Sequence, residues 1–214
     1  MTPKNVVFRE DWFSTPIFVS DHPTPEKTNY KLIKDINKWY EKDPKGISRS
    51  NTLGWHSDVY MHDQSEYNHF TEWLLEKANE MMTAIGYHPN FEAFCNYMWA
   101  NINKRYSYNK SHVHPGALWS GVYYIQIPKY SGIIRFTDPR GEAHVMQVHF
   151  DNNRKDREFS REAYYEPIEG RLLLFPGYLT HEVEPNLNED FDEDDSRGWR
   201  YSLSFNLIQK ERKL

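Results

Sequence analysis

The sequence has almost no cysteine and no long apolar run. Cys95 is the single cysteine, which excludes an intramolecular disulfide and a cysteine-rich zinc site. We expect it to be a small buried residue and not a nucleophile. No segment approaches the roughly 18 consecutive apolar residues of a membrane-spanning helix. The charged N-terminus, "MTPKNVVFREDWF", also lacks the apolar centre of a signal peptide. These absences predict a cytoplasmic protein that has no membrane segment.

Positive charge is also in short supply. The chain has 26 Lys and Arg against 31 Asp and Glu, a formal net charge of −5. This balance argues against a nucleic-acid-binding protein that relies on a global basic field. Hydrophobic residues make up only 38% of the 214 residues, but 7 Trp, 15 Tyr and 12 Phe are present. We therefore expect a globular protein with an aromatic-lined interior.

The hydrophobic pattern changes its period near residue 88. Residues 22–44 and 65–89 have apolar side chains at helical spacing, and Thr24 and Pro25 suit the start of the first helix. The later part instead has short runs rich in Val, Ile, Tyr, Phe and Trp, which predict strands at residues 94–104, 118–127, 132–138, 144–150, 170–177 and 199–208. This order predicts an antiparallel sandwich or barrel with helices packed on one side.

Two segments about 70 residues apart carry the candidate chemistry. In "NKSHVHPGALWSGVYYIQI", His112 and His114 are one residue apart, so extended backbone would point both rings to the same side and suggest a metal. In "EGRLLLFPGYLTHEVEPN", an apolar strand is followed by His181. The next predicted strand opens with Arg200, whose side chain shares one face with Ser202, an arrangement suited to a carboxylate.

The order of these parts resembles the Fe(II)/2-oxoglutarate-dependent oxygenases. The closest likeness is to a bacterial and phage group that shares "H-x-H-P", "SGVYY" and "F-x-DPR" with this chain, and the resemblance covers Asn103 to Leu207. It implies a mainly β (α+β) fold, in which a double-stranded β-helix core (a cupin-like jelly roll) spans residues 91–210. Residues 1–90 would support this core within a single domain, 1–214. The implied cofactors are Fe(II) and 2-oxoglutarate with O₂ as co-substrate, and the implied reaction hydroxylates a C–H bond and releases succinate and CO₂.

The resemblance carries over to individual residues, with one departure. His112 and His181 match the family's two histidine ligands, but His114 replaces the aspartate of its His-x-Asp motif. The third ligand could be His114, Asp138 of "FTDPR" or water, and the i, i+2 geometry favours His114. Three imidazoles also suit zinc, so the sequence leaves the choice between iron and zinc open.

The remaining site residues concern the co-substrate and the substrate. The resemblance implies that Arg200 and Ser202 hold 2-oxoglutarate, and the Tyr124 phenol could donate to the same carboxylate. Candidate substrate walls are aromatic residues and one loop, namely Trp99, Trp119, Tyr106, Tyr178 and Asn51 to Trp55.

The sequence is compatible with more than one class of substrate. The strand pattern is similar to that of prolyl hydroxylases, which predicts a peptide, amino-acid or other small-molecule substrate. The alternatives are a nucleic-acid dealkylase, for which Lys104, Arg105 and Lys110 are a modest basic track, and a non-catalytic metal-binding cupin-like protein. Exposed edge strands would permit a homodimer.

Overall fold

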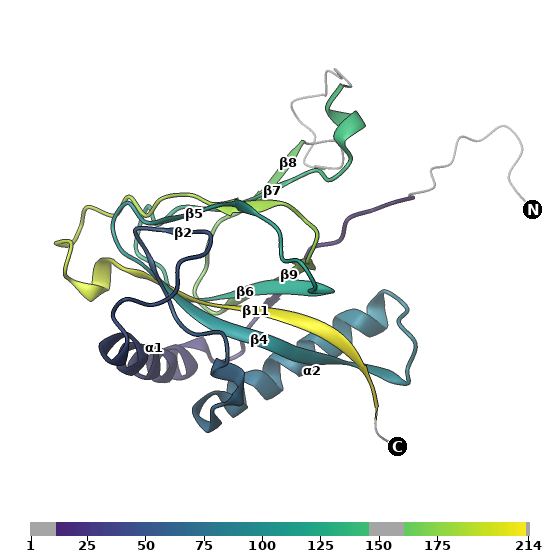
Figure 1. The fold of residues 1–214 in the computed structure, drawn as a ribbon, viewed down its shortest axis with the longest axis horizontal. Coiled ribbons are helices and arrows are strands. Elements are labelled where there is room, and N and C mark those ends of the chain that lie inside the picture. The colour runs from purple at the N-terminus through teal and green to yellow at the C-terminus, as the bar shows by residue number, and fades with distance from the viewer. Residues whose placement is uncertain (1–11, 146–160, 213–214) are drawn as a thin grey trace, which may run out of the picture.

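Two antiparallel sheets face each other, and two helices cover the outer face of the larger sheet (Figure 1). The computed structural model describes residues 12–145 and 161–212. The six-stranded sheet has the order β1 (Phe18–Asp21), β9 (Arg171–Pro176), β6 (Trp119–Gln126), β11 (Arg200–Glu211), β4 (Phe91–Asn103) and β3 (Trp55–His56). The five-stranded sheet has the order β2 (Asn51–Thr52), β5 (Tyr108–His112), β10 (His181–Val183), β7 (Ile134–Thr137) and β8 (Glu162–Tyr165). The predicted mainly β fold with helices on one side is confirmed.

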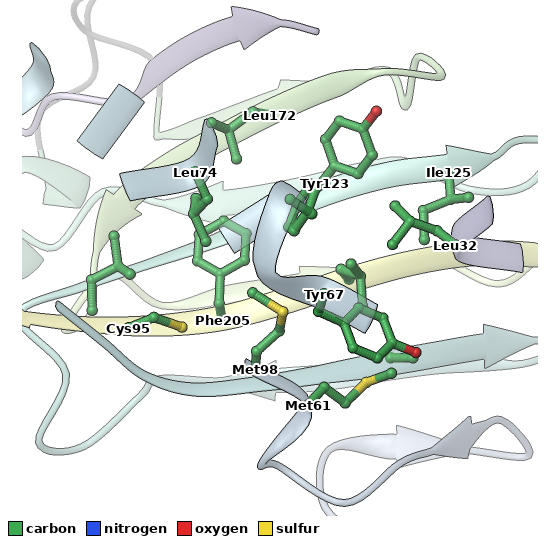
Figure 2. Close-up of a cluster of buried hydrophobic side chains, with 14 of the residues drawn as sticks. Leu32, Met61, Tyr67, Leu74, Cys95, Met98, Tyr123, Ile125, Leu172 and Phe205 are labelled. Atoms are coloured by element: carbon green, nitrogen blue, oxygen red, sulfur yellow. The ribbon is translucent and has the colours of Figure 1, made fainter. Parts of the chain in front are cut away.

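The helices α1 (Pro25–Lys42) and α2 (Asn68–Ala84) pack against the larger sheet through one apolar face each. Pro25 occupies the first turn of α1 as predicted, but the Thr24 side chain makes no capping hydrogen bond. Figure 2 shows Leu74 of α2 and Tyr67, just before it, pointing toward the strands that carry Phe205 and Tyr123. This layer holds the larger of two apolar clusters and gives the sheet a rigid back.

The second apolar cluster lies between the two sheets. It includes Val122, Ile134, Phe136, Leu173 and Phe175, which are all buried. Because side chains alternate along a strand, β11 sends Tyr201, Leu203, Phe205 and Leu207 into the helix-side cluster. Its other face, which begins with Arg200, is turned toward the space between the sheets. The space between the sheets is therefore lined by apolar side chains of this cluster and by the polar face of β11.

Some local predictions were wrong. Residues 141–145 form a short 3₁₀ turn where the predicted strand 144–150 should begin, and the rest of that strand lies outside the described residues. Five strands of two to five residues (β2, β3, β5, β8 and β10) were missed as strands. Cys95 is buried as predicted, and its burial raises the pKa of the thiol to about 12. Within the described residues, no helix has the length and apolarity needed to cross a membrane.

Candidate metal centre

Three histidines meet where two strands of the smaller sheet pair. His112 ends β5 and His181 begins β10, and these two residues are direct partners in the antiparallel ladder. His114 lies two residues past His112, held by a 2.8 Å hydrogen bond from its backbone N–H to the Gly177 carbonyl. The ring centroids of His112 and His181 are 4.3 Å apart, and each lies 5.1 Å from that of His114. One side-chain nitrogen from each residue falls within 4.8 Å of the others.

Two of these rings are oriented by the backbone. The Nδ1 atom of His112 lies 2.6 Å from the Lys110 carbonyl oxygen, and Nδ1 of His181 lies 2.9 Å from that of Leu179. A carbonyl accepts only, so each Nδ1 carries the hydrogen and each Nε2 keeps its lone pair. This fixed tautomer, with Nδ1–H bound to a carbonyl, is the usual arrangement behind a metal-ligating histidine.

The separation between two of the nitrogens fits a shared metal ion. Nε2 of His114 lies 3.3 Å from Nε2 of His181, and the two rings are nearly parallel, at 8°. Two lone pairs at this distance repel unless a proton or a cation lies between them. Neighbouring nitrogens bound to one ion at about 2.1 Å are roughly 3.0–3.4 Å apart. The observed spacing of this pair is therefore one that two ligands of a shared divalent ion can have.

Burial keeps these imidazoles neutral, which is the form that binds metal. Desolvation lowers the pKa of His181 to about 3 and that of His114 to about 4, with a further lowering from the neighbouring histidines. The pKa of His112 is lowered by burial as well. A ligand that stays deprotonated well below neutral pH does not lose its metal to protons under ordinary conditions.

Arg200 lies on the larger sheet, across the cavity from the histidines, and its guanidinium is only partly hydrogen-bonded. Its side chain is 2% exposed, and its Nη1 donates to the backbone carbonyls of Ser131, Gly132 and Glu184. Its Nη2 is buried and has no hydrogen-bond partner among the described residues. Burial lowers the pKa of the guanidinium to about 10, so it stays charged at neutral pH. A buried cation with a free N–H donor is costly unless an anionic ligand completes it.

The strand register extends this wall into a polar row across four strands. Ser202 of β11 pairs with Tyr124 of β6 on one side and with Asn101 of β4 on the other, and Asn101 pairs in turn with His56 of β3. All four residues line one cavity of about 800 Å³ that also contains the three histidines and Arg200. Burial raises the pKa of the Tyr124 phenol, so the phenol remains a hydrogen-bond donor. Histidines and carboxylate-binding groups thus line one cavity.

The other predicted site residues are distributed differently. Trp99 lines this cavity, with its ring centroid 5.8 Å from that of His114, whereas Tyr106, Tyr178 and the loop Asn51 to Trp55 are not among its lining residues. Trp119 was wrongly predicted as a wall, because its position in β6 turns it to the helix side, where its indole N–H donates to the Tyr87 hydroxyl. Asp138 does not join the histidine cluster, and its carboxylate pairs with Arg140 at 2.8 Å.

Several lining residues were missed from the sequence. His56 stacks on Trp99, with centroids 5.4 Å apart and planes 7° from parallel. Asn101 and Asn103 line the cavity from β4, and the Oδ1 atom of Asn101 is buried without a partner among the described residues. The alternation of amides with apolar residues in "WANIN" was a usable signal for both asparagines.

Comparisons with known proteins agree with this geometry. A family model described as "Putative 2OG-Fe(II) oxygenase" matches residues 97–206. A prolyl-4-hydroxylase from Pseudomonas putida has a similar structure, with a TM-score of 0.60 at 13% identity over 94% of this chain and 95% of that chain. No curated protein matches the sequence significantly.

Structures with other chemistry are similar too. A non-heme α-ketoglutarate-dependent carbocyclase, SnoK from nogalamycin biosynthesis, gives a TM-score of 0.64 at 8% identity over 92% of this chain and 82% of that chain. HygX from Streptomyces hygroscopicus, solved with nickel, 2-oxoglutarate and hygromycin B, gives 0.57 at 10% identity over 90% of this chain and 82% of that chain. At these identities the structural likeness establishes the jelly-roll fold alone. The family match covers half of the chain, and the chain belongs to the 2-oxoglutarate- and Fe(II)-dependent oxygenases, with Fe(II) and 2-oxoglutarate as cofactors and O₂ as co-substrate.

Proposed function

We propose that this oxygenase hydroxylates a C–H bond of a peptide or amino-acid substrate while 2-oxoglutarate is converted to succinate and CO₂. His112, His114 and His181 would hold Fe(II), and Arg200, Ser202 and Tyr124 would bind the distal carboxylate of 2-oxoglutarate. The observation that carries the proposal is the buried, incompletely paired Arg200 in the same cavity as three convergent neutral imidazoles.

The protein's own part in this reaction is to position its ligands and keep water out. When bound, the iron supplies the site at which 2-oxoglutarate and O₂ react. Three histidine ligands would leave positions on the metal available to the co-substrates. The free Nη2 donor of Arg200 and the Ser202 hydroxyl would hold the distal carboxylate of 2-oxoglutarate and so orient this co-substrate in the cavity. Apolar side chains between the sheets, including Phe175 and Ile134, close the cavity on the inner side.

A metal-binding protein without catalysis is a weaker reading. Such a protein would need the three histidines but would gain nothing from Arg200. Burying a guanidinium without a carboxylate partner costs several kcal/mol, about the scale of a domain's net stability. The carboxylate of 2-oxoglutarate would offset this cost when the co-substrate binds, so the buried guanidinium is explained by co-substrate binding.

The peptide or amino-acid substrate is favoured over nucleic acid by the state of the basic residues. The Lys104 ammonium lies 4.3 Å from the centroid of the Trp199 ring, and Arg105 pairs with Glu189 at 2.7 Å. Two of the three residues of the predicted basic track are therefore already engaged within the chain. Similar solved structures include a prolyl hydroxylase in complex with a peptide fragment, from Trichoplax adhaerens. That likeness supports a peptide substrate and the proposal adopts it.

The co-substrate assignment is tested by replacing Arg200. With Fe(II) under anaerobic conditions, the wild type should bind 2-oxoglutarate, and under air it should form succinate. Arg200→Met removes the charged fork, so 2-oxoglutarate affinity should fall about 100-fold, the scale of losing one partner of a buried charged pair. Arg197→Met, which alters an exposed arginine paired with Asp195, is the matched control and should bind like the wild type. Unchanged affinity in Arg200→Met would contradict the assignment.

The substrate assignment has a separate measurement. Proline-containing peptides and their alanine counterparts would be compared for the extra succinate they release and for a mass gain of one oxygen atom. Greater release with the proline peptides supports the proposal. Demethylation of a methylated oligonucleotide, with no response to any peptide, would favour the nucleic-acid dealkylase instead.

A further inference from the structure

The cavity that holds the histidines contains no acidic side chain. Of its 27 lining residues none is Asp or Glu, whereas the whole chain has 31 acidic residues among 214, so about four would be expected by composition. The charged side chains on its surface are Arg49, Lys110 and Arg200. An overall acidic protein thus surrounds this cavity with positive charge alone among the described residues.

The two additional cations lie at the mouth beside the metal-binding strand. Lys110 is in β5, two residues before His112, and its backbone N–H donates to the Ser50 carbonyl at 2.9 Å. Arg49 precedes Ser50, so the ladder brings the two cations onto neighbouring backbone segments. Both residues are exposed, and neither forms an ion pair with any described residue. Asp58, whose charge reaches His56, is not among the lining residues, and its carboxylate accepts from the Tyr60 backbone N–H.

When the metal and 2-oxoglutarate are bound, their charges do not neutralise Arg49 and Lys110. In the usual ligand set a carboxylate would offset part of the metal's charge, but here His114 replaces it with a neutral ring. With 2-oxoglutarate bound to the metal and to Arg200, its two negative charges offset only part of the positive charge of the metal and the three cations, and Arg49 and Lys110 have no anionic partner. Low-dielectric walls focus this excess toward the mouth. A cationic substrate would be repelled, and a neutral one would gain no attraction from the two mouth cations.

We propose that the primary substrate is an anion whose carboxylate binds between Arg49 and Lys110 at the mouth of the cavity. The proposal rests on the proposed function and specifies its substrate as an acidic peptide or acylated amino acid. The body of the substrate then lies against the stacked rings of His56 and Trp99. Both rings line the cavity, and Trp99 also approaches His114, so a substrate held at its carboxylate extends toward the histidine cluster.

The test compares probes that differ by one charge. N-acetylated proline peptides of one to three residues would be prepared as C-terminal acids and as primary amides. Their affinities for the protein loaded with Ni(II) and 2-oxoglutarate, in which no turnover occurs, would be measured by saturation-transfer NMR. The acids should bind at least about fivefold more tightly than the amides at low ionic strength, and added salt should reduce this difference.

A charge-reversed variant assigns the effect to the two residues. Arg49→Glu combined with Lys110→Glu should abolish or invert the preference for acids while 2-oxoglutarate affinity stays within about threefold, because Arg200 is unchanged. Lys27→Glu combined with Lys34→Glu makes the same change in net charge on exposed residues of α1 and should retain the preference. Amides that bind as well as acids, acids that do not bind, or a preference that survives the charge reversal would each overturn the proposal. Failure of 2-oxoglutarate itself to bind would instead overturn the proposed function.

Discussion

At the scale of single residues, the chemistry depends on what stands two positions after His112. An aspartate there would bring a negative charge to the metal, whereas His114 brings a neutral nitrogen that burial keeps unprotonated. The same position thus controls both the strength of metal binding and the net charge of the cavity. A single substitution at residue 114 can separate these two effects.

We expect His114→Ala to lower metal affinity by at least about 100-fold, since removal of a ligand should exceed the 10- to 100-fold typical of losing a group behind a ligand. His114→Asp should retain iron, because a carboxylate is also a ligand for Fe(II). Metal content and competition with a chelator measure both. His88→Ala, which removes an exposed histidine, should bind metal like the wild type. Full metal binding in His114→Ala would remove this residue from the ligand set.

The sequence predicted the position of a site residue where polar and apolar side chains alternate regularly along its strand. The alternation from Arg200 to Asn206 is regular, so the polar face of β11 followed directly from period two. The same rule applied to β6 would have placed Trp119 on the face opposite Tyr124, and aromatic type alone led to the wrong assignment. Arg49 and Lys110 could not be predicted as a pair, because only the contact between β5 and the segment before β2 brings them together.

At the scale of elements, the site is built from short strands supported by long ones. β10 has three residues and gains its position from β5 on one side and β7 on the other. No local signal could predict it, since its pairing depends on contacts with segments about 45 and 70 residues earlier. The long strand β11 was predictable because polar and apolar side chains alternate from Arg200 to Leu207. Most of β4 was predicted from its aromatic-rich sequence, although a bulge between Cys95 and Tyr97 interrupts its alternation.

The turn before β7 supports Arg200 through its backbone. Gly132 has φ +83°, and a Cβ at this position would collide with the Glu184 carbonyl oxygen. The carbonyls of both residues accept from Arg200 Nη1. Only glycine allows the segment before β7 and the end of β10 to approach closely enough for their carbonyls to surround the Arg200 guanidinium, an arrangement that we call the carbonyl cage.

Gly132→Ala should therefore reduce the free energy of unfolding by about 2–4 kcal/mol, from an unfavourable φ together with overpacking. It should also weaken 2-oxoglutarate binding, because displacement of Glu184 shifts the guanidinium. Urea unfolding and titration with 2-oxoglutarate measure the two effects. Gly141→Ala is the control, since a Cβ there has no neighbour within 4 Å, and its stability should change by less than about 0.5 kcal/mol. Equal behaviour of the two variants would contradict this account of the cage.

At the scale of the whole molecule, the protein places unlike environments on the two faces of one sheet. The helix side of the larger sheet is apolar, and its cavity side carries His56, amides and Arg200 and faces the three histidines held by the smaller sheet. Polar groups buried in this way reduce stability until their ligands arrive. The apo protein should therefore be sensitive to the protonation of its histidines.

We expect the apo protein to lose stability as pH falls from 6.5 toward 4. The pKa values of His181, His114 and His112 are all lowered in the folded state, so the unfolded chain binds protons first and unfolding is favoured across this interval. The carboxyl groups of Asp21 and Asp195, whose pKa values lie below 3.8, have their effect at still lower pH. A fall in the urea midpoint between pH 6.5 and pH 5 therefore reports on the histidines.

Two comparisons make this pH prediction specific. His114→Gln combined with His181→Gln removes two of the titrating rings, so its urea midpoint should depend less on pH between 6.5 and 5. Ni(II) added to the wild type should move the loss of stability to lower pH, because the ion occupies the lone pairs that protons would take. A wild-type midpoint that stays constant over this interval would show that the imidazoles are not held neutral by burial. The metal would then have to displace protons in order to bind, and the preformed site described by the ring geometry would not exist in the apo protein.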